Sequence, residues 1–243
     1  MIERANGRKA TQLRPLRITR DYLPHAEGTA LIEMGNTTVV CTATIAAGVP
    51  KWLKGSGQGW VTAEYGMLPR ATDERTVREA VAKGQGGRTM EIQRLIGRSL
   101  RAVTDLTMLG ELTVTVDCDV IRADGGTRCA AINGGAVALY DALTRLGLKQ
   151  HPMQRLVGAI SLGLLDDEVL IDLDYAEDAR AGTDMNVVMA EGGGLVEVQG
   201  TAEGLPFQRE DLDRMLDLAT AGIAKVNELQ RKVLEAAAKV ERR

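Results

Sequence analysis

Aromatic residues are scarce in this chain: one Phe, four Tyr and two Trp make up 3% of its 243 residues. A surface that binds nucleic acid mainly by stacking bases on aromatic rings is therefore not expected, and any such contact would depend on charge. Cysteine is also rare, and the three thiols, Cys41, Cys118 and Cys129, cannot all pair and show no CxxC spacing. This pattern indicates neither a disulfide framework nor a zinc site, and it is typical of a reducing compartment.

Long hydrophobic runs are missing as well. No window approaches the roughly 20 apolar residues that a membrane helix needs, and the first residues hold no apolar segment of a secretory signal. We therefore expect a cytoplasmic protein with no membrane partner. A hydrophobic content of 44% is enough for a large core, and no low-complexity linker divides the chain. The expectation is one domain over residues 1–243, with approximate halves 1–150 and 151–243.

The net charge is only −3, but the charges are segregated along the chain. Residues 1–20 carry six basic side chains against one acid, and residues 68–101 carry eight against four. Residues 165–213 reverse this, with fourteen acids against two arginines. Basic segments suggest a polyanionic partner and the acidic segment suggests a cation site, although solvated faces of mixed sign are the alternative for any one cluster.

The periodicity of apolar residues predicts strands and two helices in the first part of the chain. GTALIEMGNTTVVCTATIA predicts two strands joined at Gly35-Asn36, and ELTVTVDCDVI predicts a long third strand. Helical spacing predicts an amphipathic helix from Arg88 to Val103, with a basic side, and a second helix that ends at Gly147.

The pattern then restarts. LVGAISLGLLDDEVLIDLDYAED predicts a hairpin that turns at Asp166-Asp167, and MNVVMAEGGGLVEVQGTAEG predicts two more strands. Residues 208–242 are expected to form one long closing helix or two. Strands followed by a helix, twice over, indicate an α+β fold whose two similar halves pack together.

RADGGTRCAAING, residues 122–134, places Gly-Gly-Thr-Arg between a predicted strand and a predicted helix. A lone cation at a helix N-terminus is unfavourable, because the first-turn amides and the peptide dipoles attract an anion. Gly126 lets the backbone approach closely, and Thr127 and Arg128 add donors suited to phosphate. The alternative is an ordinary turn whose arginine makes a surface ion pair.

A second glycine-arginine turn, GQGGRTMEIQ, places Arg88 at the start of the earlier helix. If the fold brings Arg88 and Arg128 together, the two guanidinium groups would hold one phosphate from two sides. The alternative is two unrelated turns. Neither turn has the GxxxxGK[ST] pattern, so a P-loop is not supported.

Acidic residues gather in DLDYAEDARAGTDMNVV. We expect Asp172 and Asp174 to alternate on a strand face, whereas Asp178 and Asp184 flank a short loop that contains glycine. Two converging carboxylates with few basic neighbours suit Mg²⁺, which takes one or two carboxylates together with water and substrate phosphate. A solvated acidic loop is the alternative, and the separate anion-binding arginines favour the metal.

Arginines for a free anion beside a metal site indicate a reaction class. A hydrolytic nuclease would activate water and has little use for a second anion site. An enzyme whose nucleophile is inorganic phosphate must hold that anion against an anionic phosphodiester, and arginines offset the repulsion. His25 and His151 are interpreted as surface residues, which agrees with a nucleophile that needs no strong general base.

Several long motifs occur in the order found in the ribonuclease PH family of phosphate-dependent exoribonucleases. These are LPRATDERT, GGRTMEIQRLIGRSLRAV, DCDVIRADGGTR and GTDMNVVM, and the resemblance runs over essentially the whole chain. It implies a ribosomal protein S5 domain 2-like fold with two pseudo-symmetric β-α halves, and a homohexameric ring built as a trimer of dimers. It also implies reversible phosphorolytic trimming of the 3′ ends of tRNA precursors, and in some members of rRNA, with release of nucleoside 5′-diphosphates.

The resemblance also implies roles for single residues. Positions that match the family's phosphate-binding residues are Arg88, Gly126, Thr127 and Arg128, and the two arginines among them also match catalytic residues. Those that match its catalytic, Mg²⁺- or Mn²⁺-binding aspartates are Asp178 and Asp184. Arg70, Arg75 and Arg78 match a basic belt that engages RNA and supports assembly, and no DNA partner is implied. Asn186 stands where polynucleotide phosphorylases have a lysine, which favours the ribonuclease PH branch.

Two other classes of protein stay open. A ring subunit that binds RNA without catalysis would be expected to lose the aspartates or the arginines, which this chain keeps. A small-molecule kinase of the same fold superfamily would need a phosphate loop of the type PxGxGLxSS, which the sequence does not contain. Binding of ATP would distinguish the kinase.

Overall fold

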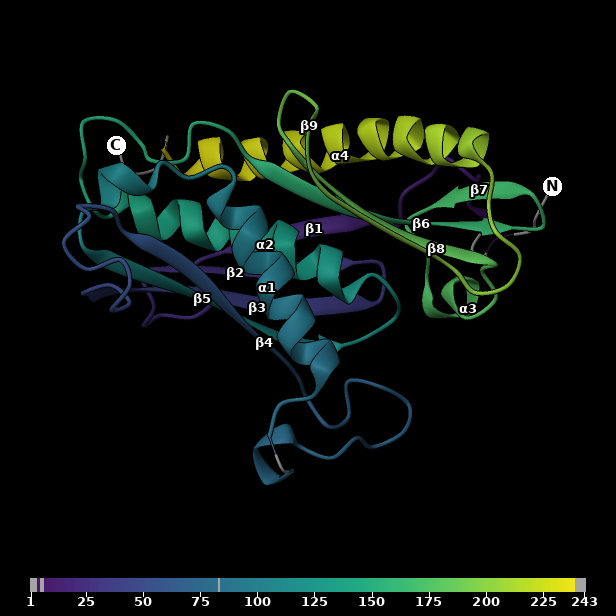
Figure 1. Ribbon diagram of the computed structural model, residues 1–243, viewed down its shortest axis with the longest axis horizontal. Helices are drawn as coiled ribbons and strands as arrows, with labels where there is room; N and C mark the ends of the chain where they lie inside the picture. The colour runs from purple at the N-terminus through teal and green to yellow at the C-terminus, as the bar shows by residue number, and fades with distance from the viewer. Residues whose placement is uncertain (1–3, 5–6, 83, 239–243) are drawn as a thin grey trace.

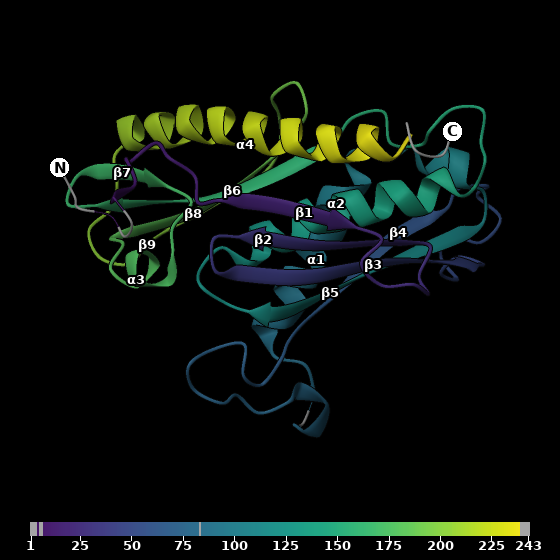
Figure 2. The same ribbon diagram turned by 180° about the vertical axis from the view of Figure 1, so that it is seen from behind.

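The computed structural model describes residues 4, 7–82 and 84–238 and arranges them in two sheets with their helices (Figures 1 and 2). The first sheet and its helices comprise β1 (Leu16–Arg20), β2 (Gly28–Met34), β3 (Thr37–Ala47), β4 (Trp60–Met67), α1 (Gly87–Arg101), β5 (Leu112–Arg122) and α2 (Thr127–Thr144). The second group comprises β6 (Val157–Leu165), β7 (Glu168–Ile171), α3 (Tyr175–Asp178), β8 (Thr183–Ala190), β9 (Gly194–Ala202) and α4 (Arg209–Ala238). Short 3-10 turns lie at Glu79–Val81 and Leu106–Leu109. The predicted α+β class is confirmed.

The first sheet has the strand order β1-β2-β3-β5-β4, antiparallel except for the parallel pair β4 and β5. The predicted hairpin turns between Met34 and Thr37, and Gly35 there has a φ of +58° that glycine adopts without strain. The alternation predicted for β5 is confirmed, because every second residue of the strand is buried: Val114, Val116, Cys118 and Val120. Parallel pairing of β4 with β5 requires a crossover, and α1 provides it.

The second sheet is antiparallel, with the order β7-β6-β8-β9. The predicted turn at Asp166 and Asp167 is confirmed, and both residues have positive φ values, 43° and 63°, which aspartate tolerates better than most side chains. One long helix, α4, runs over this sheet in both views (Figures 1 and 2). The alternative of two closing helices is therefore wrong for 209–238, and the positions beyond lie outside the described residues.

Helix α2 lies at the centre of the fold and is buried on all sides. It packs on β2 and β3 of the first sheet and on β6 of the second. Asn133 connects it to β6, because its side chain donates to the Ala159 carbonyl (2.9 Å) and accepts from the Ala159 amide (2.7 Å). The N-terminus of α2, which follows the Gly-Gly turn, is thus held between the two sheets.

The expectation that Asp172 and Asp174 share a strand face is wrong. Strand β7 ends at Ile171, and Asp172 turns the chain with a φ of +55°. Asp174 instead caps α3: its side chain accepts from the Glu177 amide, and the Glu177 side chain accepts from the Asp174 amide. This capping box starts a helical turn where alternation alone suggested a strand.

The segment 68–82 projects from the body of the molecule between β4 and α1 (Figures 1 and 2). Arg70, Arg75 and Arg78 lie on it and are exposed. Among the described helices, none is both long and apolar enough to cross a bilayer.

Candidate active site

Gly125 and Gly126 form the turn from β5 into α2, with φ values of +75° and +66°. A Cβ on Gly125 would lie 2.6 Å from the carbonyl oxygen of Leu173 and within 3.0 Å of the Tyr175 amide nitrogen. The turn therefore rests directly on the backbone that leads into α3. No described side chain caps α2, whose first amides consequently remain free for an anion.

Thr127, the first residue of α2, has a partner that the sequence did not indicate. The hydroxyl of Tyr65, on β4, donates to Thr127 Oγ1 at 2.9 Å. Burial raises the pKa of Tyr65, so its hydroxyl stays protonated as a donor. Because Tyr65 fills an acceptor position of the Thr127 hydroxyl, the proton of Thr127 itself remains available to a ligand.

Arg128 is held between α2 and α1. Its Nη2 forms an ion pair with Glu91 Oε2 at 3.1 Å, so the ion pair considered as the alternative from the sequence is present. Hydrogen bonds from Gln199 and Arg128 keep the pKa of Glu91 below its ordinary value although desolvation opposes this. Arg128 Nε, however, is buried and has no hydrogen-bond partner in the described chain. A buried guanidinium donor without an acceptor is unusual, and it marks a position where an anion fits.

Arg88 is the second residue of α1 and is exposed. Its charge and that of Arg128 both act on Tyr65, Glu91, Asp178 and Asp184. The fold therefore brings the two glycine-arginine turns to one place, although they come from different helices. The alternative of two unrelated turns is not what the structure displays.

Asp178 ends α3, and Asp184 lies on β8 after the short loop that contains Gly182. Loss of hydration raises the pKa of both carboxyl groups, and the charge of Asp178 raises that of Asp184 further. Arg128 and Arg88 oppose the shift, whereas Glu203 adds to it. The charges of the two arginines thus act on both carboxylates.

The donor set fits a divalent cation that prefers oxygen. Neither carboxylate takes part in a hydrogen bond or ion pair among the described residues, so the oxygens of Asp178 and Asp184 keep lone pairs for a ligand. Within the described residues, no three His, Cys, Asp or Glu side chains form a metal cluster, so a closed protein cage, as for structural zinc, does not fit. Two mutually repelling carboxylates suit Mg²⁺ or Mn²⁺, which would complete its shell with water and substrate phosphate.

The three arginines of the predicted basic belt lie outside this cluster. Arg70, Arg75 and Arg78 are not among the charges with the largest effects on the pKa of Asp178 or Asp184. A hollow of about 610 Å³ does separate the projecting segment from the start of α1, and both Arg78 and Arg88 line it. Of the three belt arginines, only Arg78 therefore lines a hollow that a residue of the site, Arg88, also lines.

The interpretation of residues 1–20 as a segment for a polyanion is corrected by the structure. Arg4, Arg8 and Arg14 are buried and Arg20 is half-buried, and all four pair with acids of the chain itself: Arg4 and Arg8 with Glu177, Arg14 with Asp172, and Arg20 with Asp141. Charges that are segregated along the sequence meet in space, because the N-terminal segment folds against the start of α3. Sequence spacing alone contains no signal for these pairs.

His151 is not a simple surface residue. It is half-buried, its ring stacks on Tyr140 at 3.8 Å, and its Nδ1 accepts from the Met153 amide at 3.0 Å. His25 is exposed, as expected. Neither histidine is among the groups with the largest effects on the pKa of the two aspartates.

Two family models match most of this chain. The model of the 3′ exoribonuclease family, domain 1, matches residues 12–144, and that of domain 2 of the same family matches residues 155–222. Rice (Oryza sativa) Rrp46 is similar in structure, with a TM-score of 0.79 at 24% identity over 95% of this chain and 100% of that one.

Two archaeal assemblies have similar chains. One is the Archaeoglobus fulgidus exosome with RNA bound to the active site, with a TM-score of 0.79 at 21% identity over 93% of this chain and 92% of that one. The other is an archaeal exosome core, with a TM-score of 0.76 at 21% identity over 94% and 91%. At these identities the likeness concerns the fold, which is the expected ribosomal protein S5 domain 2-like fold.

Proposed function

Since the chain belongs to the ribonuclease PH family of phosphorolytic 3′ exoribonucleases, we propose that it shortens tRNA precursors from the 3′ end, and also rRNA, with inorganic phosphate as the nucleophile. The observation that carries this proposal is the convergence of Arg128, with its unpaired buried Nε, and Arg88 on the two aspartates. A site with an anion position and a carboxylate pair suits a reaction between two phosphates.

Inorganic phosphate binds to the arginines and to Thr127. Arg128 Nε and the Thr127 hydroxyl donate to its oxygens, Gly126 allows the close approach, and Arg88 contributes charge from the other helix. These contacts hold the nucleophile in line with the last phosphodiester of the RNA. A phosphate oxygen attacks the phosphorus, the bond to the 3′ oxygen of the preceding nucleotide breaks, and a nucleoside 5′-diphosphate leaves.

Asp178 and Asp184 are the residues that would hold the divalent cation. When bound, Mg²⁺ or Mn²⁺ supplies neutralisation of the charge that develops on the phosphoryl group and on the leaving oxygen. Without a counter-ion the two carboxylates repel each other and a diester. The bond formed and the bond broken are alike in energy, so nucleoside diphosphates in excess reverse the reaction.

The projecting segment 68–82 contacts the RNA backbone in this proposal. Arg70, Arg75 and Arg78 are exposed there, and Arg78 lines the hollow that it shares with Arg88. Contacts to phosphate carry no sequence information, so preference among 3′-terminal bases is weak. Six copies in a ring, a trimer of dimers in the cytoplasm, would surround the entering strand with this charge.

The first experiment is incubation of a 3′-extended tRNA with the protein and Mg²⁺, with and without inorganic phosphate, followed by identification of the nucleotide released. We expect nucleoside diphosphate only when phosphate is present. Arg128→Ala and Asp184→Ala should each lower kcat by about 10²–10³-fold, because each removes charge stabilisation in the transition state.

The matched control is Arg209→Ala, an exposed arginine on α4 paired with Asp213, which should leave the rate unchanged. Release of nucleoside monophosphate without added phosphate would make the protein a hydrolase and overturn the proposal. No product from an intact protein that still binds RNA would favour the second candidate, an RNA-binding ring subunit.

A further inference from the structure

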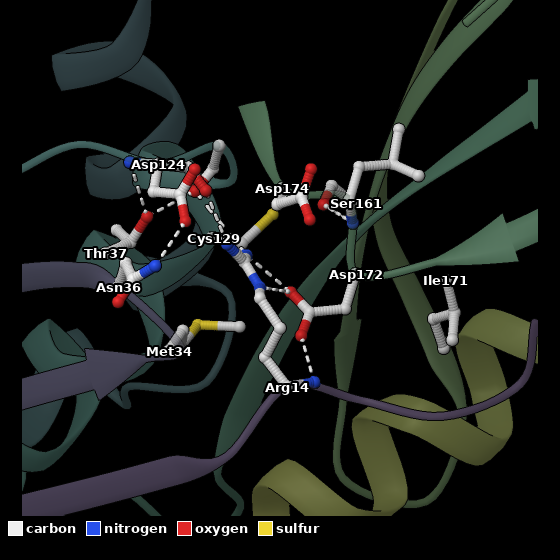
Figure 3. A network of polar contacts seen from close by, with 12 residues as sticks. Arg14, Met34, Asn36, Thr37, Asp124, Cys129, Ser161, Ile171, Asp172 and Asp174 are labelled. Atoms are coloured by element: carbon white, nitrogen blue, oxygen red, sulfur yellow. Dashed lines mark hydrogen bonds and ion pairs between the residues drawn. The ribbon is translucent and has the colours of Figure 1, made fainter. Parts of the chain in front are cut away.

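Arg14 connects the two loops that build the site, although it belongs to the N-terminal segment and is far from both in sequence. Figure 3 displays its guanidinium between Asp172 and the turn that begins at Asp124. Arg14 Nη2 and Nε donate to Asp172 Oδ1 at 2.6 and 3.1 Å, and the Arg14 amide donates to Asp172 Oδ2 at 2.7 Å. Both side chains are almost completely buried.

The other side of the Arg14 guanidinium holds the phosphate-binding turn. Its Nη1 donates to the Asp124 carbonyl at 2.5 Å, and its Nη2 lies 3.5 Å from the Gly125 carbonyl. A trans peptide points its N–H away from its C=O. When these two carbonyls face Arg14, the amides of Gly125 and Gly126 therefore point away from it, and the turn is fixed in one orientation.

Asp172 fixes the other loop. Its backbone has a φ of +55°, and its amide donates to the Ser161 carbonyl at 2.7 Å. Six residues after Asp172 comes Asp178, one of the two proposed metal ligands, and the intervening α3 is a single turn. A shift of Asp172 would therefore move Asp178 directly.

A second set of contacts joins the same two loops. The Tyr175 amide at the start of α3 donates to Asp124 Oδ1 at 3.3 Å, and Gly125 lies against the backbone at Leu173. Asn36 and Thr37, at the β2–β3 turn, also hold Asp124 (Figure 3). Asn36 Nδ2 donates to Asp124 Oδ2 at 3.1 Å, and the Asp124 amide donates to Thr37 Oγ1 at 2.9 Å.

We propose that Arg14, through Asp172, is a positioning residue that sets the distance between the phosphate-binding turn and the aspartates of the metal site. It touches neither substrate nor metal. The expected change in KM rests on the proposed function. The inference predicts a specific defect in Arg14 variants: weaker phosphate binding with the fold intact.

The chain offers a closely matched control. Arg20 also donates two hydrogen bonds to one aspartate, Asp141, and further ones to the Val233 and Leu234 carbonyls, but at another part of the fold. Arg14→Lys and Arg20→Lys each keep the charge and lose the planar fork. Their losses of thermal stability should be similar, whereas their effects on the site should differ.

The test compares both variants in binding of inorganic phosphate by calorimetry and in phosphorolysis of a 3′-extended RNA. For Arg14→Lys we expect the KM and the Kd for phosphate to rise by about 10- to 100-fold, because a displacement near 1 Å has effects of that size. For Arg20→Lys both constants should stay within about twofold, as for independent sites. If Arg14→Lys does not fold, Asp172→Asn gives the same comparison, because asparagine also tolerates the positive φ of this position.

Equal phosphate constants for Arg14→Lys, Asp172→Asn and the wild type would overturn the positioning role, even if both variants are less stable. The proposed function fails separately, when the wild type releases no nucleoside diphosphate at all. In that case binding of inorganic phosphate alone still decides whether Arg14 positions the turn.

Discussion

At the scale of single residues, the site concentrates groups that the fold holds in unfavourable states. Asp178 and Asp184 lose hydration and repel each other, and Arg128 keeps a buried donor that has no partner among the described residues. Such groups lower the stability of the unliganded protein. A cation on the carboxylates and an anion on the arginine would relieve both, so ligands should stabilise the fold strongly.

Replacing Asp184 by asparagine should stabilise the metal-free protein. The folded pKa of Asp184 is raised, so ionisation costs stability as pH rises from the unfolded pKa through the folded one, and the full cost is present above the folded pKa. Without metal at pH 7.5, the variant should melt roughly 2–4 °C higher than the wild type. Added Mg²⁺ should raise the melting temperature of the wild type and leave that of the variant unchanged.

The control is Asp166→Asn, an exposed aspartate at the β6–β7 turn, which should behave as the wild type with and without Mg²⁺. The difference between Asp184→Asn and the wild type should shrink as pH falls from the folded pKa to the unfolded one and should be absent below both, because both side chains are then neutral. A lower melting temperature for Asp184→Asn at pH 7.5 would contradict the direction of the shift.

At the scale of elements, the site depends on the packing of a turn against the start of a helix one turn long. The Gly-Gly turn between β5 and α2 touches the backbone that enters α3, and the N-terminal arginines hold α3 from the other side. Arg4 alone donates to both oxygens of Glu177 and to the Ile171 carbonyl. So short a helix would not form alone, and these contacts stabilise it.

Gly125→Ala should therefore be much more damaging than an alanine at another left-handed glycine. At Gly147, with a φ of +61° and open space around it, alanine costs only the backbone strain, about 1–2 kcal/mol. At Gly125 the new Cβ also meets backbone atoms at 2.6 Å. We expect chemical denaturation to give a larger loss for Gly125→Ala, by about 2 kcal/mol, together with a loss of phosphate binding.

An equal loss of stability in the two glycine variants would contradict the close approach of the turn to α3. A Gly125→Ala protein that is destabilised but binds phosphate like the wild type would indicate that the turn tolerates displacement.

At the scale of the whole molecule, the charges that are segregated along the sequence partly cancel inside the fold. The N-terminal arginines pair with acids near α3, whereas Arg70, Arg75 and Arg78 stay exposed on the projecting segment. That segment also exposes Val77 and Val81, which are 67% and 79% accessible. In the proposed ring, another copy of the chain is expected to cover these two valines.

We accordingly expect a mass in solution near six times the 26.1 kDa of one chain, measured by light scattering or sedimentation at physiological salt. Val81→Glu should lower this mass, because it places a charge where an apolar contact forms, and Val81→Leu should not. A wild-type protein of monomer mass that still degrades RNA would contradict the ring.

The sequence by itself determined the α+β class, the two hairpin turns, the presence of the helices after the two glycine-arginine turns, and through its motifs the family. These features depend on local periodicity and on turn residues such as Gly35 and Asp166, so neighbours along the chain specify them. The motifs also pointed to Arg88, Arg128, Asp178 and Asp184 as residues of one site.

Only the tertiary structure decided what lies around those residues. Tyr65 beneath Thr127, Glu91 beside Arg128, and Arg14 between two loops are contacts across 62, 37 and 158 positions. No local pattern encodes such pairs, because they form when α2 packs between the sheets and the N-terminal segment closes over α3. The same long-range closure buried Arg4, Arg8 and Arg14 of the N-terminal segment, which composition alone had assigned to a polyanionic partner.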